Sequence, residues 1–118
     1  MLQLNHKNLK AWQMSILFYK EALFIIRKLP KEEQFNLAGQ LRRAALSISN
    51  NIAEGAARRS TPERKRFYEV ARSSAVEVDN CFEVALAAGY FVNDDIKIAE
   101  DILEQVFKLL SAMIKNTK

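Results

Sequence analysis

The segment AGQLRRAALSISNNIAEG occupies residues 38–55 and carries apolar residues at alternating intervals of three and four. The apolar positions are Ala38, Leu41, Ala45, Ile48 and Ile52. This spacing places side chains along one stripe of a helix that packs in a bundle. The segment therefore predicts a helix with one buried face, in a fold made of several packed helices.

A helix with the same spacing is expected before this segment. Pro30 ends it, because proline removes a backbone donor and disfavours helix in the preceding residue. Pro30 is also expected in the first turn of the next helix, where no intrahelical N–H is needed. The apolar series of this first helix is Leu9, Trp12, Ile16, Tyr19, Leu23 and Ile26.

A third and a fourth helix are expected after the segment. Ser60-Thr61-Pro62-Glu63 predicts a helix start, with either Thr61 as the N-cap or Ser60 as the N-cap in a capping box. Gly89 suits the left-handed position that ends this helix, and Asn93 is expected to cap the fourth. The apolar series of the fourth helix is Ala99, Ile102, Val106, Leu109 and Met113.

The composition agrees with a small helical domain. The chain has 118 residues, with 3 Gly and 2 Pro, too few for the many turns of an all-β protein. The single cysteine, Cys81, cannot form an internal disulfide, which is typical of a reducing compartment. No targeting segment or membrane span is evident, so a cytoplasmic location is expected. The fold class expected for residues 1–118 is all-α, a single antiparallel up-down four-helix bundle.

The first and fourth helices carry more apolar residues than one buried stripe requires. Two explanations remain open: a wide core stripe with ordinary surface exposure, or a contact between copies of the chain. We favour the second, a homo-oligomer built through these two helices. The expected interface residues are Met14, Leu17, Phe18, Phe24, Ile25, Leu103, Phe107, Leu110 and Ile114.

Positive charge is concentrated in the middle of the chain. Residues 42–72 hold eight bases and three acids, a net charge of +5, against +3 for residues 1–41 and −4 for residues 73–118. Arginine suits phosphate, since its fork donates two parallel hydrogen bonds. The expected binding surface comprises Arg42, Arg43, Arg58, Arg59, Arg64, Lys65, Arg66 and Arg72.

Three interpretations of this basic surface are possible from the sequence. The first is an RNA- or DNA-binding surface, the second is a docking site for an acidic protein, and the third is a solvated turn whose bases pair with nearby Glu. Only Phe67 and Tyr68 are interleaved with the bases, and Phe67 fits the core series. A base-stacking platform is therefore poorly supported, and contact with the phosphate backbone is expected.

A polar stripe runs beside the apolar series of the second helix. Its short polar side chains lower helix propensity, so we expect a compensating hydrogen-bond network with a neighbouring helix or subunit. Glu77 is a candidate partner for Arg43. The expected structural polar residues are Arg43, Ser47, Asn51, Glu54, Gly55 and Glu77.

Gln40-Leu41-Arg42-Arg43-Ala44-Ala45-Leu46-Ser47-Ile48, followed by Asn51-Ile52-Ala53-Glu54-Gly55 and Arg59-Ser60, closely resembles the 23S rRNA intervening-sequence protein family. That family is also labelled four helix bundle protein or S23 ribosomal protein. The resemblance covers almost the whole chain. Two departures occur: Ser49 stands where many members have proline, and Ser73 stands where glycine is common.

The resemblance implies a homopentameric barrel of four-helix subunits. Some members are encoded within intervening sequences of bacterial 23S rRNA genes. A related branch resembles the accessory protein of diversity-generating retroelements, which binds nucleic acid and a reverse transcriptase through a basic surface. The stoichiometry of five comes only from the resemblance.

Enzymatic activity is not expected. His6 is the sole histidine and lies near the N-terminus, while Cys81 lies on the apolar series of the third helix. The acids of the fourth helix fit a helix N-terminus and a solvated face better than a metal site. Since no phosphate loop, nucleophile motif or metal-ligand spacing occurs, we expect no catalytic residue, cofactor or metal.

Overall fold

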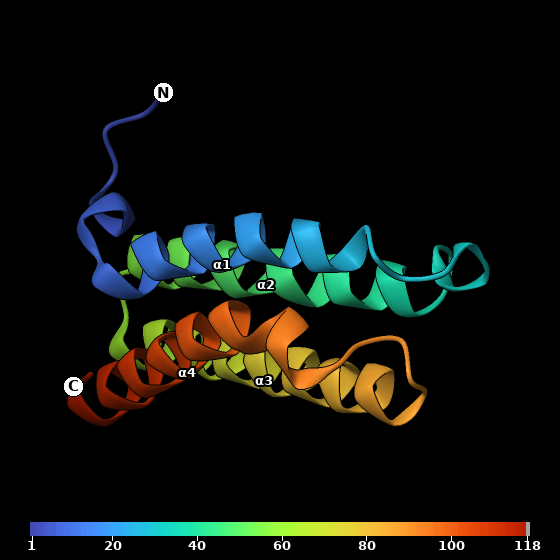
Figure 1. The fold of residues 1–118 in the computed structure, drawn as a ribbon. Coiled ribbons are helices and arrows are strands. Elements are labelled where there is room, and N and C mark those ends of the chain that lie inside the picture. The colour runs from blue at the N-terminus through green and yellow to red at the C-terminus, as the bar shows by residue number, and fades with distance from the viewer. Residues whose placement is uncertain (118) are drawn as a thin grey trace.

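The computed structural model describes residues 1–117, and within them it contains four long helices and no strand. The elements are η1 (Asn5–Asn8), α1 (Lys10–Ile26), η2 (Lys31–Glu33), α2 (Leu37–Ala57), α3 (Thr61–Ala87) and α4 (Asn93–Asn116). Figure 1 shows α1 beside α2 and α3 beside α4, with the two pairs stacked on each other. The all-helical fold is confirmed. In this part of the chain, no helix is long and apolar enough to cross a membrane.

The ends of α3 follow the sequence signals. Ser60 is the N-cap, since its Oγ accepts a hydrogen bond from the Glu63 N–H at 3.3 Å, so the Ser60 register is the one that forms. The helix stops before Gly89, whose φ of 80° lies in the left-handed region that favours glycine. Both terminal signals of α3 are confirmed, with Thr61 as the first helical residue instead of the cap.

Two other helix starts were predicted wrongly. Pro30 does not open α2: its backbone is extended, η2 follows it, and α2 begins only at Leu37. The Tyr90 hydroxyl donates to the Glu33 carboxylate at 2.7 Å, which ties this connection to the end of α3. Asn93 does not cap α4 either, since Val92 is the N-cap residue and its N–H donates to the Asp95 carboxylate at 2.9 Å.

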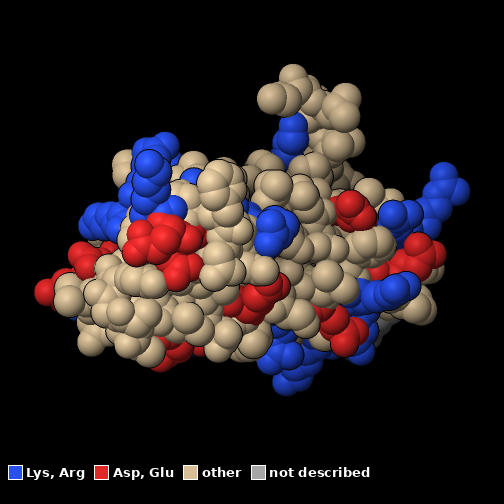
Figure 2. Space-filling view, turned by 90° about the vertical axis from the view of Figure 1, so that its right-hand side faces the viewer, with Lys and Arg blue, Asp and Glu red and all other residues tan. Residues whose placement is uncertain are grey.

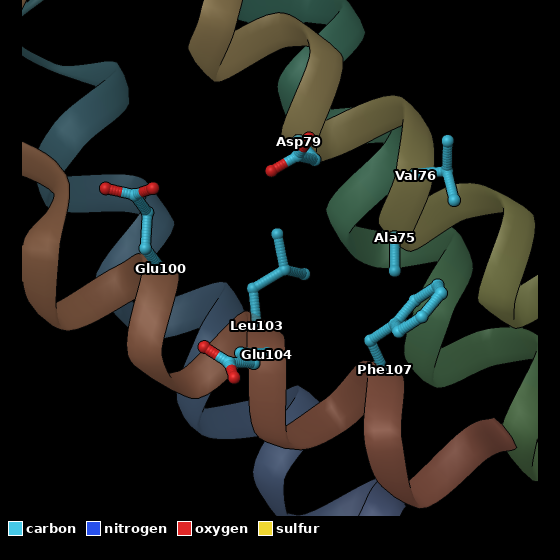
Figure 3. A pocket seen from close by; sticks show the side chains of 7 residues that line it. All are labelled: Ala75, Val76, Asp79, Glu100, Leu103, Glu104 and Phe107. Carbon is cyan, nitrogen blue, oxygen red and sulfur yellow. The ribbon is translucent and has the colours of Figure 1, made fainter.

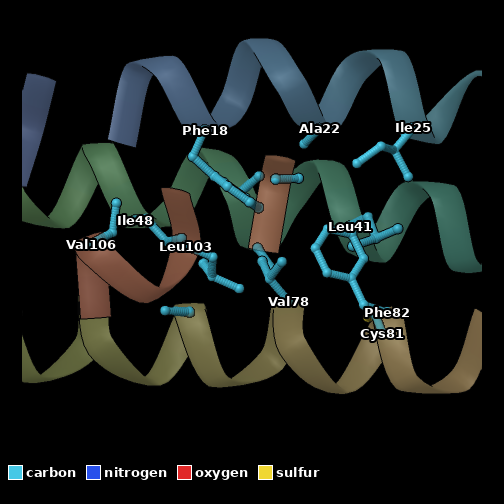
Figure 4. Close-up of a cluster of buried hydrophobic side chains, with 14 of the residues drawn as sticks. Phe18, Ala22, Ile25, Leu41, Ile48, Val78, Cys81, Phe82, Leu103 and Val106 are labelled. Carbon is cyan, nitrogen blue, oxygen red and sulfur yellow. The ribbon is translucent and has the colours of Figure 1, made fainter. Parts of the chain in front are cut away.

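The core lies between the four helices, and α2 supplies its most regular face. All five residues of the predicted α2 series are 0% exposed, which confirms that series. Figure 4 shows Leu41 and Ile48 of α2 meeting side chains of the other three helices, among them Phe18 and Phe82. The two phenylalanine rings lie tilted, with centroids 6.2 Å apart, a separation at which aromatic pairs attract.

The buried face of α1 is not the predicted one. Ile16 of the predicted series is 44% exposed, and most of the other members are only half-buried. Small residues on the buried face let α1 approach the bundle closely, which large residues on the predicted face would prevent. The buried residues of α1 are Ala11, Met14, Ser15, Phe18, Ala22, Ile25 and Ile26.

This shift changes the predicted oligomer interface. Five of its nine residues are buried or nearly buried inside the subunit: Met14, Phe18, Ile25, Leu103 and Leu110. They were misassigned because the spacing of a core stripe and of an outer stripe is the same. Phe107 and Ile114 are partly buried against the core. Leu17 and Phe24 remain about half exposed, at 49% and 52%.

Two helices approach closely at Gly55, near the end of α2. A Cβ atom placed on Gly55 would lie 2.8 Å from Cε1 of Tyr68 and 3.0 Å from Cβ of Phe67, both on α3. These separations are shorter than van der Waals contact, and Tyr68 is itself buried. Gly55 therefore allows α2 and α3 to pack directly against each other where they meet their connecting turn.

We predict that Gly55→Ala destabilises the protein by about 1–3 kcal/mol, because the added methyl forces Tyr68 or the backbone to move. Gly39→Ala is the matched control on the same helix, since its Cβ would meet only the Arg43 guanidinium, at 3.5 Å. Relief of the helix-propensity penalty should make that variant more stable by about 0.5–1 kcal/mol. Urea unfolding monitored by circular dichroism measures both. Stabilisation by Gly55→Ala would contradict the close approach.

Candidate nucleic-acid interface

Five basic side chains surround the turn between α2 and α3. Because α2 ends at Ala57 and α3 begins at Thr61, only residues 58–60 connect them. The short turn places the five bases at one end of the molecule, which we call the basic end: Arg58, Arg59, Arg64, Lys65 and Arg66.

Two of these arginines have structural partners. The Arg64 guanidinium donates to the carbonyl oxygens of Arg58 at 3.2 Å and Arg59 at 2.6 Å, and to the Thr61 hydroxyl at 3.0 Å. Arg58 lies 3.9 Å from the Glu54 carboxylate and stacks on the Phe67 ring, 4.8 Å from its centroid. Arg64 therefore closes the turn that carries the other bases.

The remaining three bases of the basic end are available to a ligand. Arg59, Lys65 and Arg66 are exposed, and their side chains form no hydrogen bond or ion pair within residues 1–117. Exposed cations that are close in space and unpaired keep their full attraction for an anion. These three residues are therefore the bases of the basic end whose charge no other described side chain neutralises.

The two aromatic residues beside the basic end differ from the prediction, which placed Phe67 in the core. Tyr68 is the buried one, at 6% exposure, and burial raises the pKa of its hydroxyl. Phe67 is half-buried and covered on one side by Arg58. Tyr68 is buried and one face of Phe67 is occupied by Arg58, so the basic end has no fully exposed aromatic ring to serve as a stacking platform.

The other predicted bases lie elsewhere. Arg42 and Arg43 lie in the first half of α2, 15 or 16 residues before Arg58, which follows the end of that helix. This separation corresponds to about 22–24 Å along the helix axis. Arg72 lies over the Phe107 ring of α4, 4.6 Å from its centroid. The eight predicted residues therefore do not form one surface: five are together at the basic end and three are apart from it.

The opposite end of the molecule has no comparable concentration. Figure 2 views the end that carries the α1–α2 and α3–α4 connections, and there Lys and Arg are interspersed with Asp and Glu. One of the pairs in these connections is Lys28 with Asp95, at 3.6 Å. Mixed charges at close range cancel within about one Debye length, so this end has little net field.

The polar stripe of α2 forms a hydrogen-bond network with α3. The Ser74 hydroxyl donates to the Ser47 hydroxyl at 2.8 Å, and the Asn51 amide donates to the same oxygen at 2.9 Å and to the Ser47 carbonyl at 2.8 Å. This contact joins the two helices midway along their length. The predicted pairing of Arg43 with Glu77 is wrong, since within the described residues these side chains form no ion pair.

A groove between α3 and α4 was not predicted from the sequence. It encloses a cavity of about 350 Å³, and Figure 3 shows Leu103 and Phe107 in its floor with Asp79 and Glu100 above them. We call it the acidic groove; its lining residues are Ala75, Val76, Asp79, Glu100, Leu103, Glu104 and Phe107. The acids on both helices were the available signal, but the sequence does not show that they face one another.

The carboxylates of the acidic groove repel each other. Burial raises the pKa of Glu100 above its ordinary value, and the nearby charges of Asp79, Glu83 and Asp101 raise it further. The pKa of Glu104 shifts the other way. Lys108 Nζ lies 2.8 Å from Glu104 Oε1, and this hydrogen bond lowers the pKa of the carboxyl. The groove therefore combines an apolar floor with an excess of negative charge.

The residues considered for catalysis have structural surroundings. His6 is half-buried in η1, and its ring meets the Trp12 ring edge-on with centroids 5.1 Å apart. Cys81 is buried, and burial followed by the Glu77 charge raises the pKa of its thiol. Residues 1–117 contain no group of three or more His, Cys, Asp or Glu side chains that could hold a metal ion.

Comparison with known proteins identifies a family. The family model described as 23S rRNA-intervening sequence protein matches residues 7–112, which is most of the chain. The match extends over all four long helices, the basic end and the acidic groove. A search of curated protein sequences found no significant match.

We predict that Arg64→Ala lowers the free energy of unfolding by about 1–2 kcal/mol, because two backbone carbonyls lose their charged donor. Arg66→Ala removes the same charge from the same end without breaking a hydrogen bond, and it should change stability by less than about 0.5 kcal/mol. Denaturant unfolding of the two variants makes the comparison. Equal losses would show that Arg64 does not hold the turn.

We predict that Glu100→Gln raises the unfolding temperature at pH 7 by about 1–3 °C. A raised folded-state pKa means that the folded protein binds this proton more tightly than the unfolded chain. Stability is then lost as pH rises from the ordinary pKa of Glu through the raised one. The advantage of glutamine should vanish at about pH 3, where both states are protonated.

Glu104→Gln is the control for this pH dependence. Its carboxylate is paired with Lys108 and its pKa is lowered, so removal of the charge should give no gain at pH 7. Calorimetry between acidic and neutral pH measures both variants. An equal gain from both would assign the effect to net charge and not to the crowded carboxylates.

Proposed function

The chain belongs to the 23S rRNA-intervening sequence protein family, and from this premise we propose that it is a non-enzymatic nucleic-acid-binding protein. In this proposal it is an up-and-down four-helix bundle that associates with copies of itself. It binds the phosphate backbone of RNA or DNA through the basic end. The observation that carries the proposal is the cluster of unpaired, exposed cations formed by Arg59, Lys65 and Arg66.

The geometry of the basic end favours phosphate as the ligand. Arg59 lies in a turn whose conformation Arg64 fixes by hydrogen bonds, so the backbone beneath the free cations is held in place. Preorganised donors lose less entropy on binding than mobile ones. Phosphate contacts of this kind give affinity and position but carry no base sequence. We therefore expect binding that depends strongly on salt and weakly on sequence.

The surroundings of Phe67 and Tyr68 support the same choice. Tyr68 is buried against Gly55, and one face of Phe67 is covered by Arg58, so neither ring is fully exposed to an unstacked base. Proteins that bind single strands by stacking use open aromatic faces beside their cations. The proposed contact is accordingly with the backbone, in single- or double-stranded nucleic acid.

Self-association would strengthen such binding. Leu17 and Phe24 leave apolar area exposed on α1, as expected for a helix that contacts another subunit. In a ring, each copy would present the same basic end, and the repeated fields would add. A ring of five is what the family resemblance implies, and we propose it on that basis.

An acidic protein is the alternative ligand. Unpaired guanidinium groups bind carboxylates in the same bidentate manner as phosphates, so the three free cations suit either partner. Competition for the basic end distinguishes the two proposals. If the ligand is an acidic protein, polyglutamate should displace it. If the ligand is a nucleic-acid backbone, RNA should bind more tightly than polyglutamate.

We predict that a triple variant, Arg59→Glu, Lys65→Glu and Arg66→Glu, binds generic RNA and DNA at least about tenfold more weakly at low salt. The slope of log affinity against log salt concentration should also fall by about 2–3, because three phosphate contacts are lost. Fluorescence anisotropy with labelled oligonucleotides at several salt concentrations gives both quantities.

The matched control changes the same total charge elsewhere. The control variant changes three exposed lysines away from the basic end, and these lysines form no ion pair in the described part of the chain. Its substitutions are Lys20→Glu, Lys31→Glu and Lys97→Glu. This triple variant should keep most of the affinity. Equal losses in both variants, or no binding by the original chain at low salt, would rule out the proposed site. Binding of polyglutamate alone would favour the acidic protein.

A further inference from the structure

The acidic groove between α3 and α4 continues beyond its main cavity. Past Val76 and Phe107 it is bordered by Glu69, Arg72 and Ser73, so it follows α3 from Glu69 to Asp79. Ten residues of helix correspond to about 15 Å of groove. Its floor is apolar, and Val76 on its wall is 55% exposed. The length and the apolar floor suit a short extended peptide segment.

The charge of the acidic groove defines the segment that it would accept. Asp79, Glu83, Glu100 and Asp101 have no ion pair within residues 1–117, and their mutual repulsion contributes to the raised pKa of Glu100. A cation brought near these carboxylates would relieve that repulsion. The complementary occupant is therefore apolar along the floor and positively charged beside the acids.

The N-terminal arm of the chain, residues 1–4, has this character. Leu2 and Leu4 are 71% and 47% exposed, although both are large and apolar. Residues 1–20 contain three lysines and no acid, and Lys7 is the third residue after the arm. Four extended residues span about 13 Å, close to the length of the groove. The arm thus matches the groove in length, polarity and charge.

The arm does not reach the groove of its own chain. Figure 1 shows it leaving the molecule from the α1–α2 pair and extending away from the α3–α4 pair. Lys7 Nζ donates to the Leu2 carbonyl, which holds the arm in this outward curl. An arm that extends away from its own groove is placed to enter the groove of a neighbour.

We infer that the N-terminal arm of one copy docks in the acidic groove of a second copy. Leu2 and Leu4 lie on the floor formed by Ala75 and Leu103, next to the Phe107 ring that Arg72 partly covers. Lys7 exchanges its hydrogen bond to the Leu2 carbonyl for the carboxylates of the groove. The contact joins two different surfaces, so it is head-to-tail, the type of contact that closes a ring or extends a chain. This inference rests on the proposed self-association and names the residues that carry it.

Cysteine cross-linking tests the contact directly. Leu4→Cys combined with Val76→Cys should give disulfide-linked dimers and larger species on a non-reducing gel. The control pair is Leu4→Cys with Ile98→Cys, because Ile98 is 66% exposed on α4 but does not line the groove. Cys81 is buried and stays in both variants. Cross-links in the control pair only, or a disulfide within one chain, would overturn the inference.

Light scattering separates this inference from the proposed self-association. The original chain should be an oligomer at micromolar concentration. Leu2→Ser with Leu4→Ser, which alters only exposed residues, should raise the dissociation constant at least about tenfold. A monomeric original chain would refute self-association and the arm contact together. An oligomer that keeps the same mass and dissociation constant in the variant would refute the arm contact alone.

Discussion

The close contact between α2 and α3 is the constraint on which the rest of the structure depends. At Gly55 the two helices approach until the Tyr68 ring occupies the space of a side chain, and further along Ser47 and Ser74 share a hydrogen bond. A connection of three residues is then sufficient between them. The same contact therefore brings the last turn of α2 and the first turn of α3 together, and with them the five bases of the basic end.

The helix α3 serves two surfaces of opposite charge. Its first turns carry Lys65 and Arg66, while Asp79 faces the acidic groove fourteen residues later. That interval corresponds to about 21 Å of helix, which is two Debye lengths or more at physiological salt. The two charged surfaces hardly influence each other through solvent. An anionic ligand at the basic end and a cationic segment in the groove could therefore bind to the same subunit together.

The buried face of a helix could be predicted from the sequence only where a single face of that helix is apolar. The α2 series was predicted completely because its other faces are polar, so only one stripe can be buried. On α1 apolar residues surround the helix, and spacing alone could not distinguish the buried face. The small residues Ala11, Ser15 and Ala22 mark that face, but their significance depends on the distance to the neighbouring helices.

The candidate site was predictable where it depends on chain proximity. Arg58, Arg59 and Lys65 were expected together because they flank one short turn, whereas Arg72 was grouped with them by sequence distance and lies on Phe107 instead. The role of Arg64 depends on carbonyl directions in the turn, which no residue pattern specifies. For the same reason the facing acids of α3 and α4 became visible only in the folded chain. The stretch by which the chain resembles its family includes Ser47 and Gly55, which lie against α3, and Asn51, whose amide donates to Ser47. The family match covers this packed face of α2, whereas Arg59, Lys65 and Arg66 are exposed and take no part in its packing.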